Sequence, residues 1–572
     1  MRMHEYLLPF CMLIVGCASP ETADDDIDPP GGASALRVEL SAHRIDWVDG
    51  TAAAPTVHVT RIAADGSETD VTSAATLTVT PVELAAVTNA EIVASGTAAG
   101  PGTVIASVDG LSDDDAFEVF VTKTLPGSGD PSTAALFDTA TAEPSTALAI
   151  AYPPADAMIP PNLGEMDVHW RDTAGKDVYE VMLASHFVTL KTYVATLGAA
   201  TFQTLAPADW TMLSSGSHGT DLTVRVRGLA TAAPATFIES TEQVRIAAEQ
   251  VRGGVYYWNT TRSAIMRFDM TAQATPPEQF YPAVGQSGCV GCHAVSRDGS
   301  VVAYRSEGDN MNYGNALAVS SLQKQLPENT QRWNFAAVHP DNSELFTTTT
   351  TGLYRTVLAT GATTPLYTGG RISHPDVAAN GTQIVATALT GGSEVWTSAS
   401  SLVVFDYDTT ARTVGAPRTL VPQTGAAFPY YPAFSPDNAW VLYNQATGGT
   451  SYDNRNAELW VTKADGSSAP IRMSAAEQAA SYDSWPKWTP FMNIEPTATA
   501  SEPVMWFTVA SRRPFGVRST ANQKPQLWLA PFYPERAAAG QPATGPAIRM
   551  PFQDLAQGNH IAQWAEEIVT IQ

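Results

Sequence analysis

A short motif that recurs along the second half of the chain limits the possible folds more than any other feature. Each copy has a small residue or proline, an apolar residue, a turn centred on Asp-Gly, Asn-Gly or Asp-Asn, and a second apolar run. The copies are HAVSRDGSVVAYRS (293–306), AAVHPDNSELFTTT (336–349), PDVAANGTQIVATA (375–388) and PAFSPDNAWVLYNQ (432–445), with a weaker one in PKWTPFMNIEPTAT (486–499). A strand–turn–strand unit that returns at intervals of tens of residues predicts a repeat architecture of small β-sheets.

Further strand-like runs follow the copies of this motif. They are ALAVSSL, SLVVFDYDT, ELWVTKADG and QLWLAPF. Taken with the motif, they resemble the repeat of the TolB-like propeller family, which is related to the WD-type propellers. The resemblance covers residues 251–572 and implies a β-propeller.

The two ends of this region together supply one more repeat. NHIAQWAEEIVTI (559–571) fits the first two strands of a blade, and GVYYWNTTRSAIMRFDM (254–270) fits the outer two. A blade divided between the chain ends closes the ring and leaves no open sheet edge. We therefore predict six blades.

The N-terminal half predicts two further β domains. Residues 36–123 alternate apolar and polar positions in short runs such as TVHVTRI and FEVFVT, and they resemble bacterial Ig-like domains. We interpret 124–139 as a linker and 140–250 as a second Ig-like or fibronectin-like β-sandwich, with Trp170 in its core. The predicted fold class is thus all-β, with two sandwiches followed by a six-bladed propeller. The 41 glycines and 40 prolines agree with many turns.

The N-terminus has the features of an export signal. The apolar run LLPFCMLIV is too short to span a bilayer, and IVGCAS (14–19) resembles the lipobox of bacterial lipoproteins. The resemblance makes 1–17 a lipoprotein signal peptide in which Cys17 becomes the lipid-bearing residue. Ala18 after that cysteine favours the outer membrane, and 18–35 is an acidic linker. The alternative is an ordinary secretory signal that happens to contain Cys17.

The charge balance restricts the possible partners. The chain has 57 acidic and 32 basic residues and a formal net charge of −25. Such a surface repels nucleic acid, so we expect no nucleic-acid partner. The expected partners are a membrane, reached through the N-terminal lipid, and proteins that bind the Ig-like domains or a propeller face.

The sequence GCVGCHAV (288–295) carries the one motif with definite chemistry. Cys11 lies in the signal and Cys17 carries lipid, so Cys289 and Cys292 are the cysteines left in the mature protein. CxxCH is the attachment signature of c-type haem: the two thiols meet the porphyrin vinyl groups and the histidine, here His293, binds the iron. The alternative is a CxxC disulfide beside an unrelated histidine. Zinc is disfavoured because no second cysteine pair exists.

The repeat alignment places this motif in the propeller. His293 aligns with Pro432, at the entry to the innermost strand of a blade, so we expect one covalent haem c near the central channel. For the second axial position we rank His560 first, then His374, then Met311, with an open position as the alternative. His339 falls at the opposite end of a blade and is interpreted as structural.

Three functions are compatible with these features. The first is electron transfer by a membrane-tethered mono-haem protein, in the periplasm or at the cell surface, to an unidentified redox partner. The second is a peroxidase-like haem enzyme with an open iron. The third is a TolB-like binding or scaffold protein in which haem is structural. Fold alone does not decide between them. Arg297, Arg305 and Trp485 lie near the motif turns, but no pattern marks them as catalytic.

Overall fold

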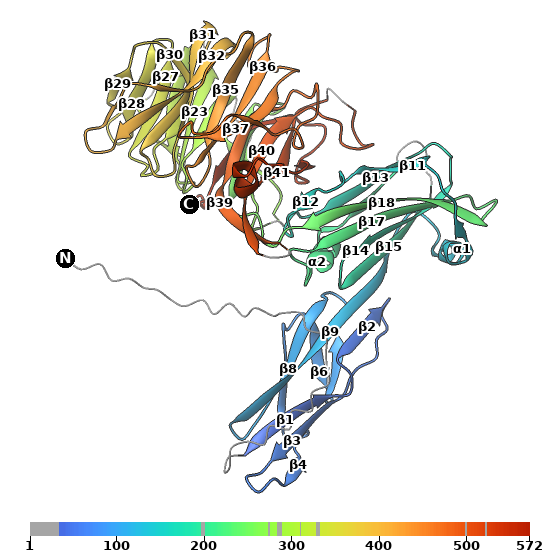
Figure 1. Ribbon diagram of the computed structural model, residues 1–572. Coiled ribbons are helices and arrows are strands. Elements are labelled where there is room, and N and C mark those ends of the chain that lie inside the picture. The colour runs from blue at the N-terminus through green and yellow to red at the C-terminus, as the bar shows by residue number, and fades with distance from the viewer. Residues whose placement is uncertain are drawn as a thin grey trace.

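The computed structural model describes residues 34–572 except 196–200, 273–274, 283–288, 309–310, 328–331, 498–499 and 521–522. The described chain is almost wholly β-structure, and the prediction of an all-β chain is confirmed (Figure 1). Its helices are short: the 3₁₀ turn η1 (Pro131–Thr133), α1 (Ala134–Thr139), α2 (Pro207–Ser214) and α3 (Pro534–Ala538). Within the described ranges, no helix has the length and apolar character needed to cross a bilayer. Cys17 and the signal region lie outside these ranges.

The N-terminal unit consists of two small sheets and a hairpin. Its strands are β1 (Ala35–Leu40), β2 (Arg44–Val48), β3 (Val57–Ile62), β4 (Glu68–Asp70), β5 (Thr76–Thr80), β6 (Ala85–Thr88), β7 (Glu91–Ala94), β8 (Gly100–Val108) and β9 (Leu111–Leu125). One sheet has the order β1-β3-β4, and β2 joins the other in parallel with β9. Alternate positions such as Val59, Val104 and Val119 are fully buried between them, which is the period-2 pattern that the sequence shows.

The second unit is built in the same way. Its strands are β10 (Thr141–Ala142), β11 (Leu148–Tyr152), β12 (Met158–Ile159), β13 (Met166–Asp172), β14 (Val178–Ala184), β15 (Val188–Ala195), β16 (Phe202–Leu205), β17 (Asp221–Leu229) and β18 (Thr236–Ile246). A β11-β13-β16 sheet faces the larger sheet that contains β14, β15, β17 and β18. Trp170 is completely buried in this core, as expected.

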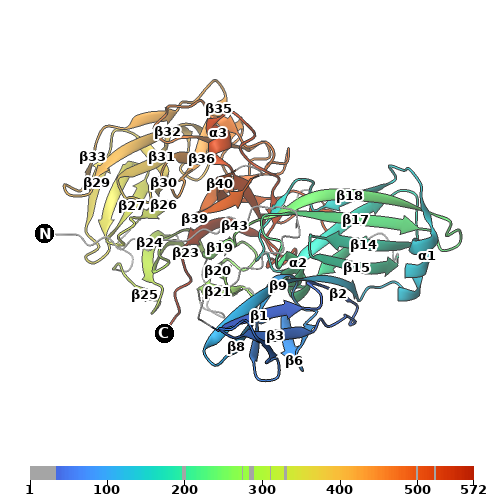
Figure 2. The same cartoon turned by 60° about the horizontal axis from the view of Figure 1, so that its bottom comes forward.

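The two N-terminal units share one sheet, which corrects the predicted linker 124–139. Strand β9 runs on to Leu125 and pairs in parallel with β15, from Val121 opposite Val188 to Leu125 opposite Thr192 (Figure 2). Buried Val119, Val121 and Leu125 keep the strand alternation going past the expected boundary. Most of the remaining segment forms η1 and α1, whose Phe137 is buried against the second unit.

Six sheets follow in the described part of residues 254–565. The strands of each sheet are given from the innermost outward. The first two sheets are β43 (Asn559–Ala565), β19 (Gly254–Asn259), β20 (Ala264–Asp269) and β21 (Glu278–Tyr281), and then β22 (Cys289–Val295), β23 (Val301–Gly308), β24 (Met311–Ala318) and β25 (Gln323–Lys324). The third and fourth are β26 (Phe335–Val338), β27 (Glu344–Thr349), β28 (Gly352–Val357) and β29 (Thr363–Tyr367), and then β30 (Arg371–Val377), β31 (Gln383–Gly392), β32 (Thr397–Asp408), β33 (Thr413–Val414) and β34 (Arg418–Val421). The last two are β35 (Ala427–Phe434), β36 (Trp440–Thr447), β37 (Glu458–Lys463) and β38 (Ile471–Arg472), and then β39 (Ser484–Pro496), β40 (Ser501–Ser511), β41 (Gln526–Phe532) and β42 (Ile548–Arg549).

These sheets form a closed ring, which is the arrangement of a β-propeller (Figure 2). The innermost strands contact one another in the order β22, β26, β30, β35, β39 and β43, and β43 contacts β22 again. Because each of these sheets is flanked on both sides, its flat faces are covered by its neighbours.

The recurring sequence motif is the tight turn between the first and second strands of a blade. Gly299, Asn342, Gly381 and Asn438 stand at the same motif position and all have positive φ, between 59° and 77°. Gly and Asn adopt this left-handed conformation more readily than other residues, which explains the Asp-Gly, Asn-Gly and Asp-Asn pairs. The weak copy 486–499 differs, because β39 runs through it without a turn as far as Pro496.

The chain ends close the ring, but not with the predicted division of strands. The C-terminal segment supplies a single strand, β43, whose Ala565 and Asn559 pair with Gly254 and Asn259 of β19. The segment 254–281 supplies the other three strands. Residues 566–572 form no strand; Ile568 instead packs against the apolar cluster between this blade and the next.

Candidate functional site

Five residues at one end of the innermost strands share an unusual backbone conformation. Cys292, His374, Tyr431, Trp485 and Ile561 have φ between 48° and 54°, in strands β22, β30, β35, β39 and β43. Non-glycine residues in this region cost about 1–3 kcal/mol each. In all five blades the pairing register with the second strand shifts at this residue, so each of the five residues occupies a β-bulge. We call these five residues the mouth ring.

The bulges bring most of the mouth-ring side chains into one aromatic cluster. The ring centroid of His374 lies 3.9 Å from that of Phe335, 4.6 Å from that of Tyr431 and 5.3 Å from that of Trp485. Tyr431 stacks on Trp485 with centroids 4.0 Å apart. Cys292 packs against the same cluster. The CxxCH motif therefore lies at the end of the central channel, as the repeat alignment predicted.

A cavity of about 140 Å³ continues from the mouth ring into the channel. Cys292, His293 and His374 line it, together with an ion pair in which Lys487 Nζ lies 2.7 Å from Asp376 Oδ1. A cavity of this size accepts a benzene-sized group, whereas sites for drug-sized ligands measure about 300–1,000 Å³. A whole porphyrin does not fit inside it.

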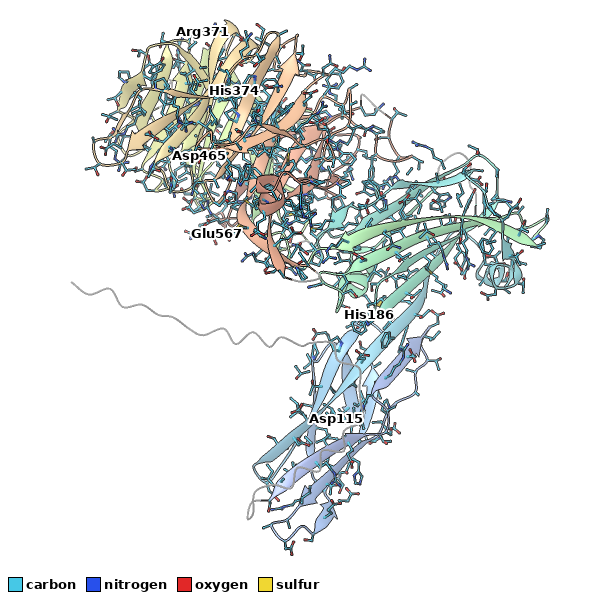
Figure 3. All side chains as sticks on the ribbon, in the orientation of Figure 1. Asp115, His186, Arg371, His374, Asp465 and Glu567 are labelled. Atoms are coloured by element: carbon cyan, nitrogen blue, oxygen red, sulfur yellow. The ribbon has the colours of Figure 1, made fainter. Side chains whose placement is uncertain are left out.

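His293 and His374 share a rare property for buried histidines. They are 3% and 4% exposed, and neither ring nitrogen of either residue has a hydrogen-bond partner within the described part of the chain. Burial lowers the pKa of His293 to about 4, against the smaller raising effect of a contact with the Tyr256 backbone that lies outside hydrogen-bond geometry. Burial also lowers the pKa of His374 well below its usual value. Both imidazoles are therefore neutral at pH 7, which is the form that binds metals. Figure 3 shows His374 among the strands of the propeller.

His560 has a different environment. Its Nε2 lies 2.8 Å from the hydroxyl oxygen of Ser484, and burial lowers its pKa to about 3. It lines a separate cavity of about 120 Å³, together with Trp258, Tyr452 and Arg512. The structure thus places His293 and His374 on one cavity and His560 on another.

The remaining predicted ligands are less fully described. Cys289 begins β22 and Met311 begins β24, but their side chains lie outside the described part of the structure. Among described residues, no group of three or more His, Cys, Asp or Glu side chains is arranged to hold a metal ion. The donor chemistry nevertheless fits a haem iron, because His293 is neutral, buried and adjacent to Cys292.

The sequence reasoning missed several residues of the site. Phe335, Tyr431 and the Asp376–Lys487 pair were not singled out, although Asp376 and Lys487 lie in two copies of the repeat and Tyr431 stands at the same repeat position as Cys292. Arg297 lines the inner cavity, where its Nε lies 2.6 Å from Glu566 Oε1.

No protein-family model matches the sequence, and no curated protein matches it. Several solved structures match parts of the chain at low similarity. A putative TolB from Agrobacterium tumefaciens is 13% identical (TM-score 0.32), covering 52% of this chain and 88% of its own. TolB from Acinetobacter baumannii is 10% identical (TM-score 0.37), with 60% and 79% covered. A quinonprotein alcohol dehydrogenase-like protein from Bacteroides thetaiotaomicron is 8% identical (TM-score 0.29), with 73% and 96% covered. At these identities the comparisons say nothing about activity.

Proposed function

We propose that this protein is a membrane-tethered mono-haem c-type protein that transfers electrons outside the cytoplasm. The observation that carries the proposal is His293: a buried, neutral histidine whose two nitrogens have no partner among the described residues, directly after Cys292 of a CxxCH motif. A buried polar group without a partner is unfavourable unless something else satisfies it. An iron atom bound by one nitrogen would satisfy it.

The residues of the mouth would share the work of holding the group. Cys289 and Cys292 would carry the thioether bonds and His293 would be the proximal ligand. Phe335, Tyr431 and Trp485 would exclude water from that side of the channel. A haem c bound here would supply reversible one-electron transfer.

We propose His374 rather than His560 as the second residue that would hold the group. Because the cavity that His293 and His374 share is smaller than a porphyrin, the side chains that line it would have to move apart. Both nitrogens of His374 lack a partner among the described residues and it shares the channel cavity with His293, whereas Nε2 of His560 already contacts Ser484. Two imidazole ligands would make the iron six-coordinate and low-spin, which suits electron transfer rather than peroxidase chemistry.

The proposal includes a definite architecture and location. We interpret the six sheets as six propeller blades and the two N-terminal units as Ig-like sandwiches that hold the propeller away from the membrane. The anchor is the lipid on Cys17, in the outer membrane. The change Cys17→Ser should move the protein from the membrane fraction to the soluble periplasmic fraction, and unchanged membrane association would contradict the anchor.

An optical spectrum tests electron transfer against the enzyme alternative. Protein matured in cells that assemble c-type cytochromes should give a low-spin spectrum in both oxidation states, and carbon monoxide should bind slowly or not at all. A high-spin ferric spectrum with rapid carbon monoxide binding would indicate an open iron and would favour a haem enzyme. The double variant Cys289→Ala/Cys292→Ala is the control, and it should lack covalent haem.

A further inference from the structure

A second cavity lies far from the mouth ring, between the second N-terminal unit and the propeller. The long hairpin of β39 and β40 extends from its blade and reaches the sheet that contains β17 and β18 (Figure 1). The cleft beside it measures about 550 Å³, within the range of small-molecule sites, and clefts between domains are common binding sites. Its lining comes from both parts of the molecule. The charged lining residues are Asp156, Asp221 and Arg245 on the N-terminal side and Glu495, Glu502 and Arg536 on the propeller side.

The cleft has more negative than positive groups. Four carboxylates and two guanidinium groups line it. Both arginines already donate to the protein: Arg245 to Asp221, at 3.3 Å, and to the Pro496 carbonyl, at 2.9 Å, and Arg536 to Glu502. Both arginines therefore already have partners, and the surplus negative charge of the lining favours binding of a cation.

Glu495 is the side chain that points to a ligand. It is 2% exposed, and its Oε1 accepts a hydrogen bond of 2.6 Å from the backbone N–H of Ala248. Its Oε2 has no hydrogen-bond partner among the residues that the structure describes. Nε of Arg245 forms an ion pair with Oε2 at 3.8 Å, a distance too long for a hydrogen bond. A buried carboxylate oxygen at a cleft wall without a donor is unfavourable until a donor arrives.

We propose that this cleft binds a small organic cation with a primary ammonium or guanidinium group, which donates to Glu495 Oε2. Asp221, on the N-terminal side of the cleft and largely exposed, would receive the other end of the ligand. The ligand would link the second N-terminal unit to the propeller and hold their relative orientation. The site is independent of the haem, so its failure would leave the proposed function unaffected.

Titration calorimetry of the purified full-length protein with agmatine tests this site. Agmatine carries an ammonium group at one end and a guanidinium group at the other, so it can engage both walls. Glu495→Gln keeps the acceptor for Ala248 but removes the charge, and it should weaken binding about tenfold or more. Asp221→Asn should weaken it about two- to fivefold, since that carboxylate is exposed. Glu239→Gln, on β18 but outside the cleft lining, should bind as the wild type does.

A second ligand and a metal ion serve as controls for the charge and the size of the cation. 4-Guanidinobutanoate has a carboxylate in place of the ammonium group and should bind more weakly than agmatine. The proposal is overturned if the wild type does not bind agmatine, if Ca²⁺ alone binds at the cleft in its place, or if 4-guanidinobutanoate binds equally well. If Glu495→Gln fails to fold, Asp221→Asn decides: an affinity equal to that of the wild type would overturn the proposal.

Discussion

Two groups of buried histidines in this protein have opposite surroundings. His169, at the contact between the second N-terminal unit and the propeller, is completely buried. Its Nε2 lies 3.2 Å from Asp167 Oδ2, and its Nδ1 accepts a hydrogen bond of 3.3 Å from the backbone N–H of Val517. Asp167 also accepts from Thr204 and, at 2.6 Å, from Arg518. Every polar atom of the His169 ring is satisfied by the protein itself.

At the channel cavity beside the mouth ring, by contrast, all four ring nitrogens of His293 and His374 lack hydrogen-bond partners in the part of the chain that the structure describes. Native proteins pair nearly all buried polar groups, so the two histidine environments imply different roles. The His169 network is a structural joint that fixes the propeller against the second unit. At the channel cavity we propose that a ligand satisfies the histidine nitrogens. The state of hydrogen bonding, not burial or residue type, separates the two.

The largest expected effect comes from opening the ring. Deleting 559–572 removes β43, leaves β19 and β39 without their shared neighbour, and removes Ile561 from the mouth ring. The propeller should lose its cooperative unfolding transition, because the edges of an unclosed ring are exposed. Differential scanning calorimetry measures this. A propeller transition within a few degrees of the wild type would show that closure by β43 is dispensable.

Paired substitutions sharpen the contrast between the joint and the mouth. Asp167→Asn leaves Arg518 without its anion and should lower the free energy of unfolding by about 3 kcal/mol, at the lower end for a buried pair because Arg518 is partly exposed. His374→Phe replaces an unsatisfied polar ring with an apolar one among aromatic neighbours, and should change it by less than about 1 kcal/mol.

Urea unfolding of haem-free protein, made in cells that do not mature c-type cytochromes, measures both variants. Equal losses of stability for the two would remove the distinction between a satisfied and an unsatisfied histidine site. A large loss of stability for His374→Phe alone would mean that His374, and not the Asp167–His169 network, has the structural role.

The optical spectra of two variants test which histidine would be the second ligand of the haem iron. In haem-loaded protein, His374→Ala should convert a low-spin spectrum to a high-spin one, because a strong-field nitrogen ligand is lost. His560→Ala should leave the spectrum unchanged, because Nε2 of His560 is engaged with Ser484. The reverse result would assign the position to His560, and insensitivity to both would direct attention to Met311.

The smallest effect concerns acid stability at the joint. Burial opposes ionisation of Asp167, but the hydrogen bonds from His169, Thr204 and Arg518 outweigh it and lower the pKa of Asp167 to about 2. The unfolded state therefore binds this proton at a higher pH than the folded state, and the stabilisation is lost as pH falls from about 4 to about 2. The free energy of unfolding falls by about 2 kcal/mol over this pH range. Unfolding at pH 7, 4 and 2.5 should show this loss in the wild type, and Asp167→Asn should lack it.

The fold was predictable wherever the sequence carries a local cause. The positive φ of Gly299 and Asn438 requires the residues that the motif repeats, and buried Val59 and Val119 follow the strand alternation. The division of the closing blade was not predictable, because the run IVTI (568–571) is compatible with a strand and only packing against the neighbouring blade decides its path.

The site shows the same limit. CxxCH fixes Cys292 and His293 by local spacing, and the repeat register places both at the channel. The choice between His374 and His560 depends on whether a neighbour satisfies the ring, and Ser484 is 76 residues distant from His560 in sequence. No motif encodes a contact of that kind.

The central claim is that the mouth holds one covalent haem, and acid–acetone extraction followed by a pyridine haemochrome assay tests it most directly. Protein expressed with the c-type maturation machinery should keep its haem through extraction, at one haem per chain, and Cys289→Ala/Cys292→Ala should not. Haem that is fully extracted from the wild type, or a wild type that carries none under these conditions, would contradict the account and leave His293 and His374 without their proposed ligand.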